Sequence, residues 1–306
     1  MSEPVISVSE LYRRYGAKMA LAAVNLSVPR GVVYGLVGAN GAGKTTLIKH
    51  ILGLCEAQSG SVRVFGLDPV ADPVGVLSRI GYLSEDPGLP GWMSVAELIR
   101  YSRAFYPAWD DGYAEELRRA FALDSSAKIK NLSKGQKARA GLLVALAYRP
   151  ELLVLDEPSS GLDPIVRRDI LGAVIRTIAD EGRTVLFSSH LLEEVEQVAD
   201  HVTMISHGKI VLSALLDDIR RSHRWVTVRF AQSRAQPPAV SGVLQWNGGG
   251  HEWTALVHGV DDLQAAVGGW GAHIVAERAA TLDEIFVGHA GVAAPAPTAA
   301  EADADA

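Results

Sequence analysis

Short apolar runs alternate with segments of helical periodicity from about residue 5 to residue 214. This alternation is typical of a largely parallel sheet flanked by helices. Three of the runs are almost entirely apolar, and each leads into glycine, acidic or hydroxyl residues: 32–37, 152–155 and 184–187. Because a strand that is apolar on both faces is buried on both faces, we expect these three strands at the centre of an α/β core.

The stretch from about residue 94 to residue 148 has a more helical pattern. Apolar residues recur at helical spacing over 95–105, 112–122 and 134–148. Candidate N-caps precede the second and third of these segments: Asp110, Asp111 and Ser133. The pattern predicts a helical subdomain inserted into the α/β core.

The pattern changes again after about residue 221, where apolar and polar residues alternate as in half-buried strands. The segments 225–230 and 253–257 are the expected strands, followed by a helix over 260–267 and a last segment around Ile274. Glycines predict a turn between the two strands: Gly248, Gly249 and Gly250.

The length of the chain fits two folded parts, because single cores usually divide before they reach 306 residues. We expect a main domain over 1–220 and a small α+β accessory domain over 221–290. The tail over 291–306 holds Ala, Pro, Asp and little else, which predicts disorder.

Composition and charge narrow the possible partners. The chain carries 29 basic and 35 acidic residues, a net charge of −6, so it has no excess positive field to hold DNA or RNA. Its one cysteine, Cys55, cannot form an intrachain disulfide. The N-terminus lacks the pattern of an export signal, and no apolar run approaches the roughly 20 residues of a spanning helix. We therefore expect a soluble protein that binds no nucleic acid and reaches any membrane through a partner.

A glycine-rich loop follows the first central strand and opens a helical segment. From Gly38 to Thr45 it reads Gly-Ala-Asn-Gly-Ala-Gly-Lys-Thr, which fills every fixed position of the P-loop motif in its required context. Backbone N–H groups and the helix N-terminus form an anion cradle, Lys44 binds β- and γ-phosphate oxygens, and Thr45 offers a hydroxyl to Mg²⁺. The sequence therefore predicts that ATP and Mg²⁺ are bound by Gly38, Asn40, Gly41, Ala42, Gly43, Lys44, Thr45 and Thr46.

Polar residues also follow the other two central strands. Asp156 and Glu157 come directly after 152–155, and His190 follows 184–187 through two serines. Successive residues at a strand end point to opposite sides, so we expect Asp156 to hold Mg²⁺ and Glu157 to be the general base. Phosphoryl transfer calls for another polar group near the γ-phosphate, and His190 is our candidate.

Together these motifs resemble one family, the nucleotide-binding subunits of ABC transporters, over roughly residues 5–220. The distinguishing element is Leu-Ser-Lys-Gly-Gln at 132–136, which is similar to the family's LSGGQ signature with Lys134 for the first glycine. Ser133 also begins a predicted helix, where its hydroxyl and free N–H groups form an anion site. The resemblance implies that the signature closes on ATP held by the P-loop of a second copy or a paralogue, through Ser133, Gly135 and Gln136.

Three further positions are compared with the family. Asp163 lies in a segment similar to the D-loop, which crosses the dimer interface, and Tyr15 matches the aromatic residue that stacks on adenine. Glu85 stands where the family usually has a glutamine that touches Mg²⁺ and senses the membrane partner. A carboxylate can still reach a cation but adds negative charge beside the phosphates. We interpret Glu85 as an adaptation and assign it to the metal site with Thr45 and Asp156.

The resemblance implies a P-loop NTPase core of ABC type and an ATPase subunit that powers export through a separately encoded membrane permease. Segments 105–110 and 281–286, together with Lys134, look like the branch that serves drug or antibiotic permeases. The implied location is cytoplasmic, peripheral on the inner face of the cell membrane through the permease.

Two alternatives stay open at this point. One is a soluble ABC-type ATPase without a transporter, although such relatives carry coiled-coil insertions or tandem ATPase units, and this sequence shows neither. The other is a regulatory subunit that binds ATP and hydrolyses it weakly because of Glu85. A kinase would leave the signature unexplained.

Overall fold

This computed structural model describes residues 3–293 of the chain, apart from the side chains of residues 173–181, 292 and 293. Contacts divide the chain into a first unit, Met1–Ile210, and a second unit, Val211–Ala306. The division falls about ten residues before the predicted boundary at 220/221. It does so because α8 (Leu216–Ser222) already packs against β10 (His223–Arg234) within the second unit.

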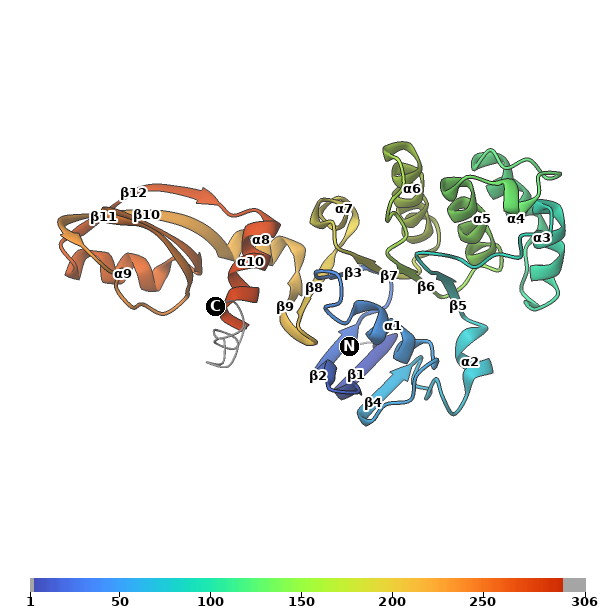
Figure 1. The fold of residues 1–306 in the computed structure, drawn as a ribbon, viewed down its shortest axis with the longest axis horizontal. Helices are drawn as coiled ribbons and strands as arrows, with labels where there is room; N and C mark the ends of the chain where they lie inside the picture. Colours follow the sequence, from blue (N-terminus) through green and yellow to red (C-terminus); the bar gives the residue numbers. More distant parts are fainter. Residues whose placement is uncertain (1–2, 294–306) are drawn as a thin grey trace, which may run out of the picture. The chain divides into compact units, whose positions relative to one another are not determined.

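A six-stranded sheet in the order β5-β6-β7-β3-β8-β9 forms the centre of the first unit (Figure 1). The adjacent strands β6 (Leu152–Asp156), β7 (Thr184–Ser189) and β3 (Val33–Val37) are buried at every residue and pair in parallel. Their predicted central place is confirmed. The remaining strands are β5 (Ile80–Leu83), β8 (His201–Ser206) and β9 (Lys209–Leu215), the last of which runs across the division. Because parallel strands end at one edge, the loops after β3, β6 and β7 meet there.

A second, antiparallel sheet in the order β2-β1-β4 is absent from the predicted organisation. Its strands are β1 (Ile6–Tyr15), β2 (Lys18–Val28) and β4 (Ser59–Val64), and they share a hydrophobic cluster with α1 (Lys44–Ile51). Register shifts interrupt the β1–β2 pairing, and Glu10 and Ala23 have positive φ values of 47° and 53°. These bulges break the period-two alternation by which a strand is found in a sequence.

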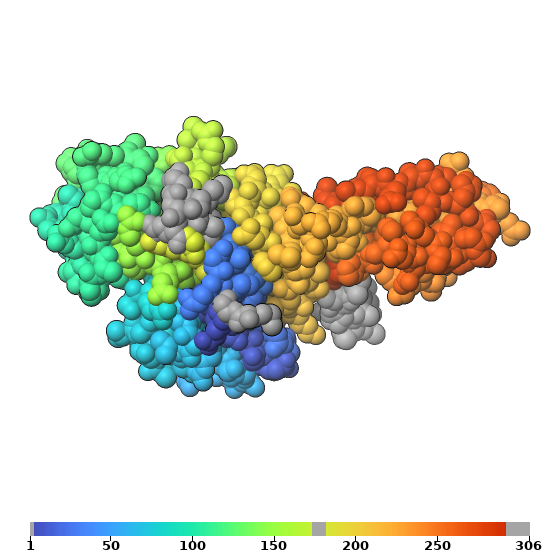
Figure 2. Space-filling view, turned by 180° about the vertical axis from the view of Figure 1, so that it is seen from behind, coloured from blue at the N-terminus to red at the C-terminus, as the bar shows by residue number. Residues whose placement is uncertain are grey.

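The helical subdomain contains the predicted helices as α3 (Val95–Arg103), α4 (Asp111–Ala120) and α5 (Lys134–Leu146). Each begins at a side-chain cap, respectively Ser94, Asp110 and Ser133, so Asp110 and not Asp111 caps α4. Each ends two residues before its predicted end. Figure 2 shows these residues, in green, gathered on one side of the first unit, away from the blue residues of β1 and β2.

Further helical segments complete the first unit. They are α2 (Pro73–Leu77), a 3₁₀ turn (Ile129–Asn131), α6 (Pro164–Glu181) and α7 (Leu192–Val198). Among residues 3–293, none of the helices combines the length and the apolar composition that a membrane span requires.

The second unit is an α+β fold built on an antiparallel sheet in the order β11-β10-β12. Beside β10 lie β11 (Val243–His258) and β12 (Ala272–Ala279), with α9 (Asp261–Gly269) and α10 (Leu282–Ala293). Alternate residues of β10 form its core with α9: Val226, Val228 and Phe230 against Leu263 and Val267.

Two details of this unit correct the predictions. The turn predicted at Gly248–Gly250 does lie between segments 225–230 and 253–257, but β11 begins before it, at Val243, so the turn lies inside that strand. His258 N–H donates to Gly242 O at 2.7 Å, and a Cβ on Gly248 would lie 2.5 Å from Glu252 O, so the two halves of β11 double back on each other. Helix α10 continues to Ala293, into the tail predicted from residue 291. The rest of that tail lies outside the described residues.

A pair of histidines joins α10 to β10 inside the second unit. His223 is 0% exposed, and its Nε2 lies 3.0 Å from Nε2 of His289. His223 Nδ1 lies 2.9 Å from the carbonyl of Ile219, so Nδ1 carries the proton and Nε2 accepts from His289. The His258 ring stacks on His223 at a centroid distance of 4.7 Å. Burial lowers the pKa of His223 to about 4 and also lowers the pKa of His289.

We expect acidification to destabilise the second unit. The unfolded chain binds a proton at His223 near pH 6.5, whereas the folded unit resists it until about pH 4, so the stability contributed by the neutral ring is lost as pH falls through this window. Between pH 7 and pH 5 the free energy of unfolding should fall by about 2 kcal/mol. Denaturant unfolding of the full chain followed at both pH values measures this. A His223→Gln variant with an unchanged pH slope would contradict the assignment.

Candidate functional site

The P-loop joins β3 to α1 at the edge where the central strands end. Its glycines are required by close packing: a Cβ on Gly38 would lie 2.3 Å from Ile205 O, and one on Gly43 would lie 2.8 Å from Ala20 O. Gly41 and Gly43 also have φ values of 79° and 119°, which side chains disfavour. Helix α1 begins at Lys44 without a side-chain cap, so the N–H groups of its first turn are open to an anion.

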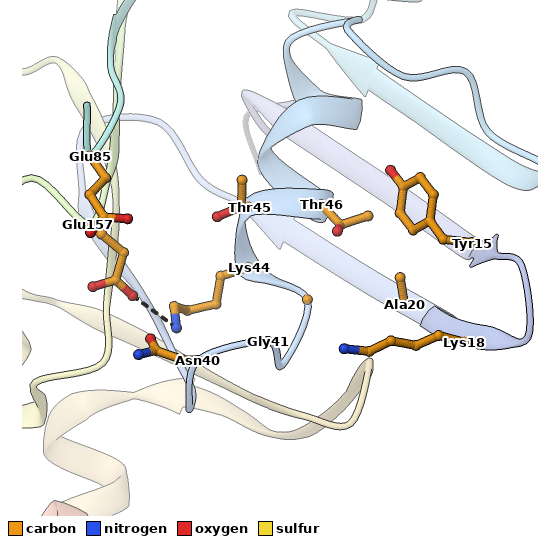
Figure 3. Close-up of a pocket in the computed structure, with 11 residues that line it drawn as sticks. Tyr15, Lys18, Ala20, Asn40, Gly41, Lys44, Thr45, Thr46, Glu85 and Glu157 are labelled. Atoms are coloured by element: carbon orange, nitrogen blue, oxygen red, sulfur yellow. Dashed lines mark ion pairs between the residues drawn. The ribbon is translucent and has the colours of Figure 1, made fainter. Parts of the chain in front are cut away.

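Lys44 points back across the loop into a buried position. Only 5% of Lys44 is exposed, and its ammonium donates to Gly38 O at 2.5 Å and Ala39 O at 3.2 Å. The same nitrogen lies 2.9 Å from Oε1 of Glu157, as Figure 3 shows. The general-base candidate and the phosphate-binding lysine therefore meet directly.

A cavity of about 370 Å³ lies over the P-loop (Figure 3). Tyr15 and Lys18 reach it from the ends of β1 and β2, and Glu85 from the segment after β5. The Tyr15 ring is 45% exposed, with the Arg13 guanidinium 4.7 Å from its centroid. The other lining residues are Ala20, Asn40, Gly41, Gly43, Lys44, Thr45, Thr46 and Glu157.

Asp156, the last residue of β6, and Glu157, which follows it, have different surroundings. Asp156 is 3% exposed and accepts a hydrogen bond from Ser188 Oγ at 2.8 Å. Burial raises the pKa of Asp156, and hydrogen bonds from Ser188 and Thr45 offset only part of that effect. Thr45 and Asp156, both oxygen donors, therefore lie together, as expected for a Mg²⁺ site.

Glu157 follows the strand with φ 51°, in the left-handed region, and this turns its side chain toward Lys44 and His190. His190 Nδ1 lies 2.6 Å from Glu157 Oε2, and the His190 backbone N–H donates to the same oxygen at 3.3 Å. Burial would raise the pKa of Glu157, but the hydrogen bonds from Lys44 and His190 outweigh it and hold the pKa below its ordinary value. Glu157 is therefore an ionised carboxylate at neutral pH, as a base must be.

The signature residues lie outside this cavity. Ser133 and Gln136 bond each other: Ser133 Oγ accepts from Gln136 N–H at 3.2 Å, and Gln136 Oε1 accepts from Ser133 N–H at 2.9 Å. A Cβ on Gly135 would lie 2.7 Å from Val166. Asp163 Oδ1 accepts from the N–H groups of Ile165 and Val166 and thus caps α6. The fold brings the P-loop together with Asp156, Glu157, His190, Glu85 and Tyr15, whereas none of Ser133, Gly135, Gln136 and Asp163 lines the cavity.

Two residues at the site were missed by sequence reasoning. Ser188 bonds Asp156 and also accepts from Glu157 N–H at 3.0 Å. The sequence does contain a signal for Ser188, because it is a hydroxyl residue at the end of a central apolar run. In the sheet it pairs with Asp156 of the neighbouring strand. Lys18 lies 3.8 Å from the Cβ position of Gly41, and nothing in the sequence marks this lysine.

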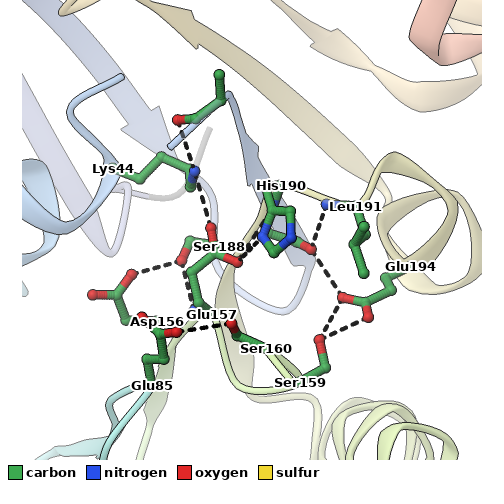
Figure 4. A network of polar contacts seen from close by, with 12 residues as sticks. Lys44, Glu85, Asp156, Glu157, Ser159, Ser160, Ser188, His190, Leu191 and Glu194 are labelled. Carbon is green, nitrogen blue, oxygen red and sulfur yellow. Dashed lines mark hydrogen bonds and ion pairs between the residues drawn. The ribbon is translucent and has the colours of Figure 1, made fainter. Parts of the chain in front are cut away.

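A buried polar cluster borders the site (Figure 4). Glu194, 2% exposed, accepts from the hydroxyls of Ser159 and Ser189 at 2.7 and 2.9 Å and pairs with Arg167 at 3.0 Å. These contacts connect α7 to the segments after β6 and β7. They fix the backbone that carries Glu157 and His190.

The fold and this site define a P-loop nucleoside-triphosphatase of the ABC type. Residues 21–160 match the family model described as ABC transporter. The bacitracin transport ATP-binding protein BcrA of Bacillus licheniformis is 32% identical over 72% of this chain and 72% of its own length. The daunorubicin/doxorubicin resistance ATP-binding protein DrrA of Streptomyces peucetius is 34% identical over 76% of this chain and 72% of its own.

Solved structures of ABC transporter ATP-binding proteins have the same fold as the first part of this chain. One described as the ATP-binding subunit of an ABC transporter superposes with a TM-score of 0.65 at 31% identity, over 71% of this chain and 92% of the other. The dimeric bacterial ABC transporter cassette MJ0796 shares the fold, with a TM-score of 0.63 at 21% identity over 69% of this chain and 98% of the other. This chain belongs to the family of ABC transporter ATP-binding proteins. It is an ATPase, and the two relatives named above are described as bacitracin transport and daunorubicin/doxorubicin resistance proteins.

Proposed function

We propose that this ATPase powers the export of a small molecule, such as a drug or an antibiotic, through a membrane permease on a separate chain. The observation that carries the proposal is that Glu157 contacts both Lys44, at 2.9 Å, and His190, at 2.6 Å, below the P-loop. The names of the bacitracin and daunorubicin relatives support the class of cargo. Such an ATPase works in the cytoplasm, held to the inner face of the membrane by the permease.

Thr45, Asp156 and Glu85 fit the metal site. Asp156 is buried and its side chain meets the Thr45 hydroxyl, and Glu85 lines the same cavity, so the donors are all hard oxygens. Mg²⁺ held by these residues would neutralise negative charge on the phosphates. Ser188 orients Asp156 by donating to its Oδ1.

Lys44 and Glu157 exchange partners during the cycle. When ATP enters, Lys44 takes phosphate oxygens in place of Oε1 of Glu157, and that oxygen becomes able to accept a proton from the attacking water. His190 keeps Oε2 fixed, so the carboxylate stays aimed at the P-loop. Tyr15 lines the cavity and would stack on the adenine.

Two copies, or this chain and a paralogue, complete each site. Ser133 caps α5 at an exposed helix end, where unpaired N–H groups attract an anion. With Gly135, Gln136 and the Asp163 segment, this end would close on ATP bound by the second copy. The dimeric form of the MJ0796 cassette supports this arrangement.

Purification from native membranes tests the proposal. Extraction in a mild detergent should bring a polytopic membrane protein with this chain, and vesicles holding both should expel a drug substrate only with hydrolysable ATP. The Lys44→Ala chain serves as the inactive control. Recovery with soluble partners alone would favour the alternative of an ATPase without a transporter.

A further inference from the structure

Two side chains that depart from the family pattern meet at one residue, Ser160. Lys134 Nζ donates to the carbonyl of Ser160 at 2.7 Å. The Ser160 hydroxyl donates to Oε1 of Glu85 at 2.8 Å (Figure 4). A glycine at position 134 could not reach Ser160, so this bridge depends on the lysine.

The backbone around Ser160 accommodates the bridge. Gly161 has φ 64°, and a Cβ there would lie 2.8 Å from Lys134 Nζ. A side chain at position 161 would therefore push the ammonium away from the Ser160 carbonyl. The glycine and the lysine form one local arrangement.

Ser160 is tied directly to the general base. Its backbone N–H donates to the carbonyl of Glu157 at 3.1 Å, which closes the turn that follows β6. Glu157 enters that turn with φ 51°, a conformation that its surroundings must maintain. Whatever fixes Ser160 also fixes the backbone of Glu157.

Glu85 and Lys134, the two residues that depart from the family pattern, also carry opposite charges. Glu85 lines the cavity with Glu157 (Figure 3), so it places another carboxylate beside the phosphates. Lys134 brings a positive charge to the carbonyl of Ser160. Both side chains are exposed and screened by solvent, so their contribution to folding stability is small. Their effect is on geometry.

We propose that Lys134 and Glu85 are a pair of positioning residues that hold Ser160, one through its carbonyl and the other through its hydroxyl, and thereby orient Glu157 for catalysis. The inference rests on the proposed role of Glu157 as the base. It assigns Glu85 a function in its own chain, in addition to the metal site, and it explains why a signature lysine and an acid occur together here.

Steady-state kinetics of the full-length ATPase test the pair. We expect Lys134→Met and Ser160→Ala each to lower kcat by roughly threefold to tenfold, the cost of a charge-assisted or polar hydrogen bond, with KM for ATP changed less than about twofold. The double variant should lose little more than either single one, because both act through Ser160. Lys134→Arg should restore most of kcat, and Lys137→Met, one turn along α5, is the matched control.

Variants of Glu85 test whether its hydrogen bond with Ser160 matters for hydrolysis. Glu85→Gln keeps an oxygen for the Ser160 hydroxyl, so it should lose less activity than Glu85→Ala. A large gain in kcat for Glu85→Gln, or unchanged kcat for Lys134→Met, would overturn the positioning role. If Glu157→Gln itself hydrolyses ATP at the normal rate, the proposed function fails, and this outcome is distinct from failure of the pair alone.

Discussion

A Glu157→Gln variant should bind ATP normally and hydrolyse it roughly 10² to 10³ times more slowly than the unaltered protein. Glutamine keeps the shape and the contact with His190 Nδ1, but it cannot accept a proton from water. Phosphate release at saturating ATP measures the rate of hydrolysis, and binding of a fluorescent ATP analogue measures the affinity for ATP.

The same variant should also accumulate as an ATP-bound dimer, since closing precedes hydrolysis in the proposed cycle. Light scattering with and without ATP would detect the dimer, and Ser133→Ala in the same background should weaken it. Glu151→Gln is a matched control, because Glu151 lies beside the start of β6 in an exposed pair with Arg79 and should retain activity within about twofold. Particles that stay monomeric at saturating ATP would contradict the shared site.

A Lys44→Ala variant should lose both nucleotide binding and hydrolysis. Apart from His190, Lys44 is the only basic side chain in direct contact with Glu157 among the described residues, and in the proposed cycle it exchanges this contact for phosphate. We expect ATP affinity to fall by roughly 10² or more, from the loss of charge-assisted hydrogen bonds in a buried position. Equilibrium binding of ATP, at a fixed Mg²⁺ concentration, measures it.

The Lys44→Ala substitution also leaves Glu157 buried with one partner fewer. This should raise the pKa of the Glu157 carboxyl and lower the stability of the fold. Lys49→Ala, on the exposed side of α1, controls for changes in the helix. Near-normal ATP affinity for Lys44→Ala, with a folded protein shown by circular dichroism, would exclude the predicted phosphate contact.

The central part of the site could be predicted because it depends on short-range rules. The P-loop, Asp156, Glu157 and His190 each follow a strand that is apolar throughout, and parallel neighbours must end at the same edge. Their convergence was therefore implicit in the order of the strands. The helix caps at Asp110 and Ser133 are similarly local.

Other features depend on tertiary contacts that a local pattern does not contain. The antiparallel sheet that carries Tyr15 and Lys18 is disguised by bulges at Glu10 and Ala23. The start of β11 before the turn could not be predicted, because it depends on which segments pair in the sheet. Lys134 and Glu85 were recognised as departures from the family, but their meeting at Ser160 joins residues 75 and 26 positions apart in the sequence from that serine.

The contact of Gly135 with Val166 sets how motion can spread through the first unit. With 2.7 Å between a potential Cβ and the valine side chain, α5 and α6 touch backbone to side chain at their starting turns. Two surfaces pressed together in this way cannot slide without a clash. We therefore expect that a displacement of the first turn of α5, which carries the signature residues, moves the first turn of α6 with it.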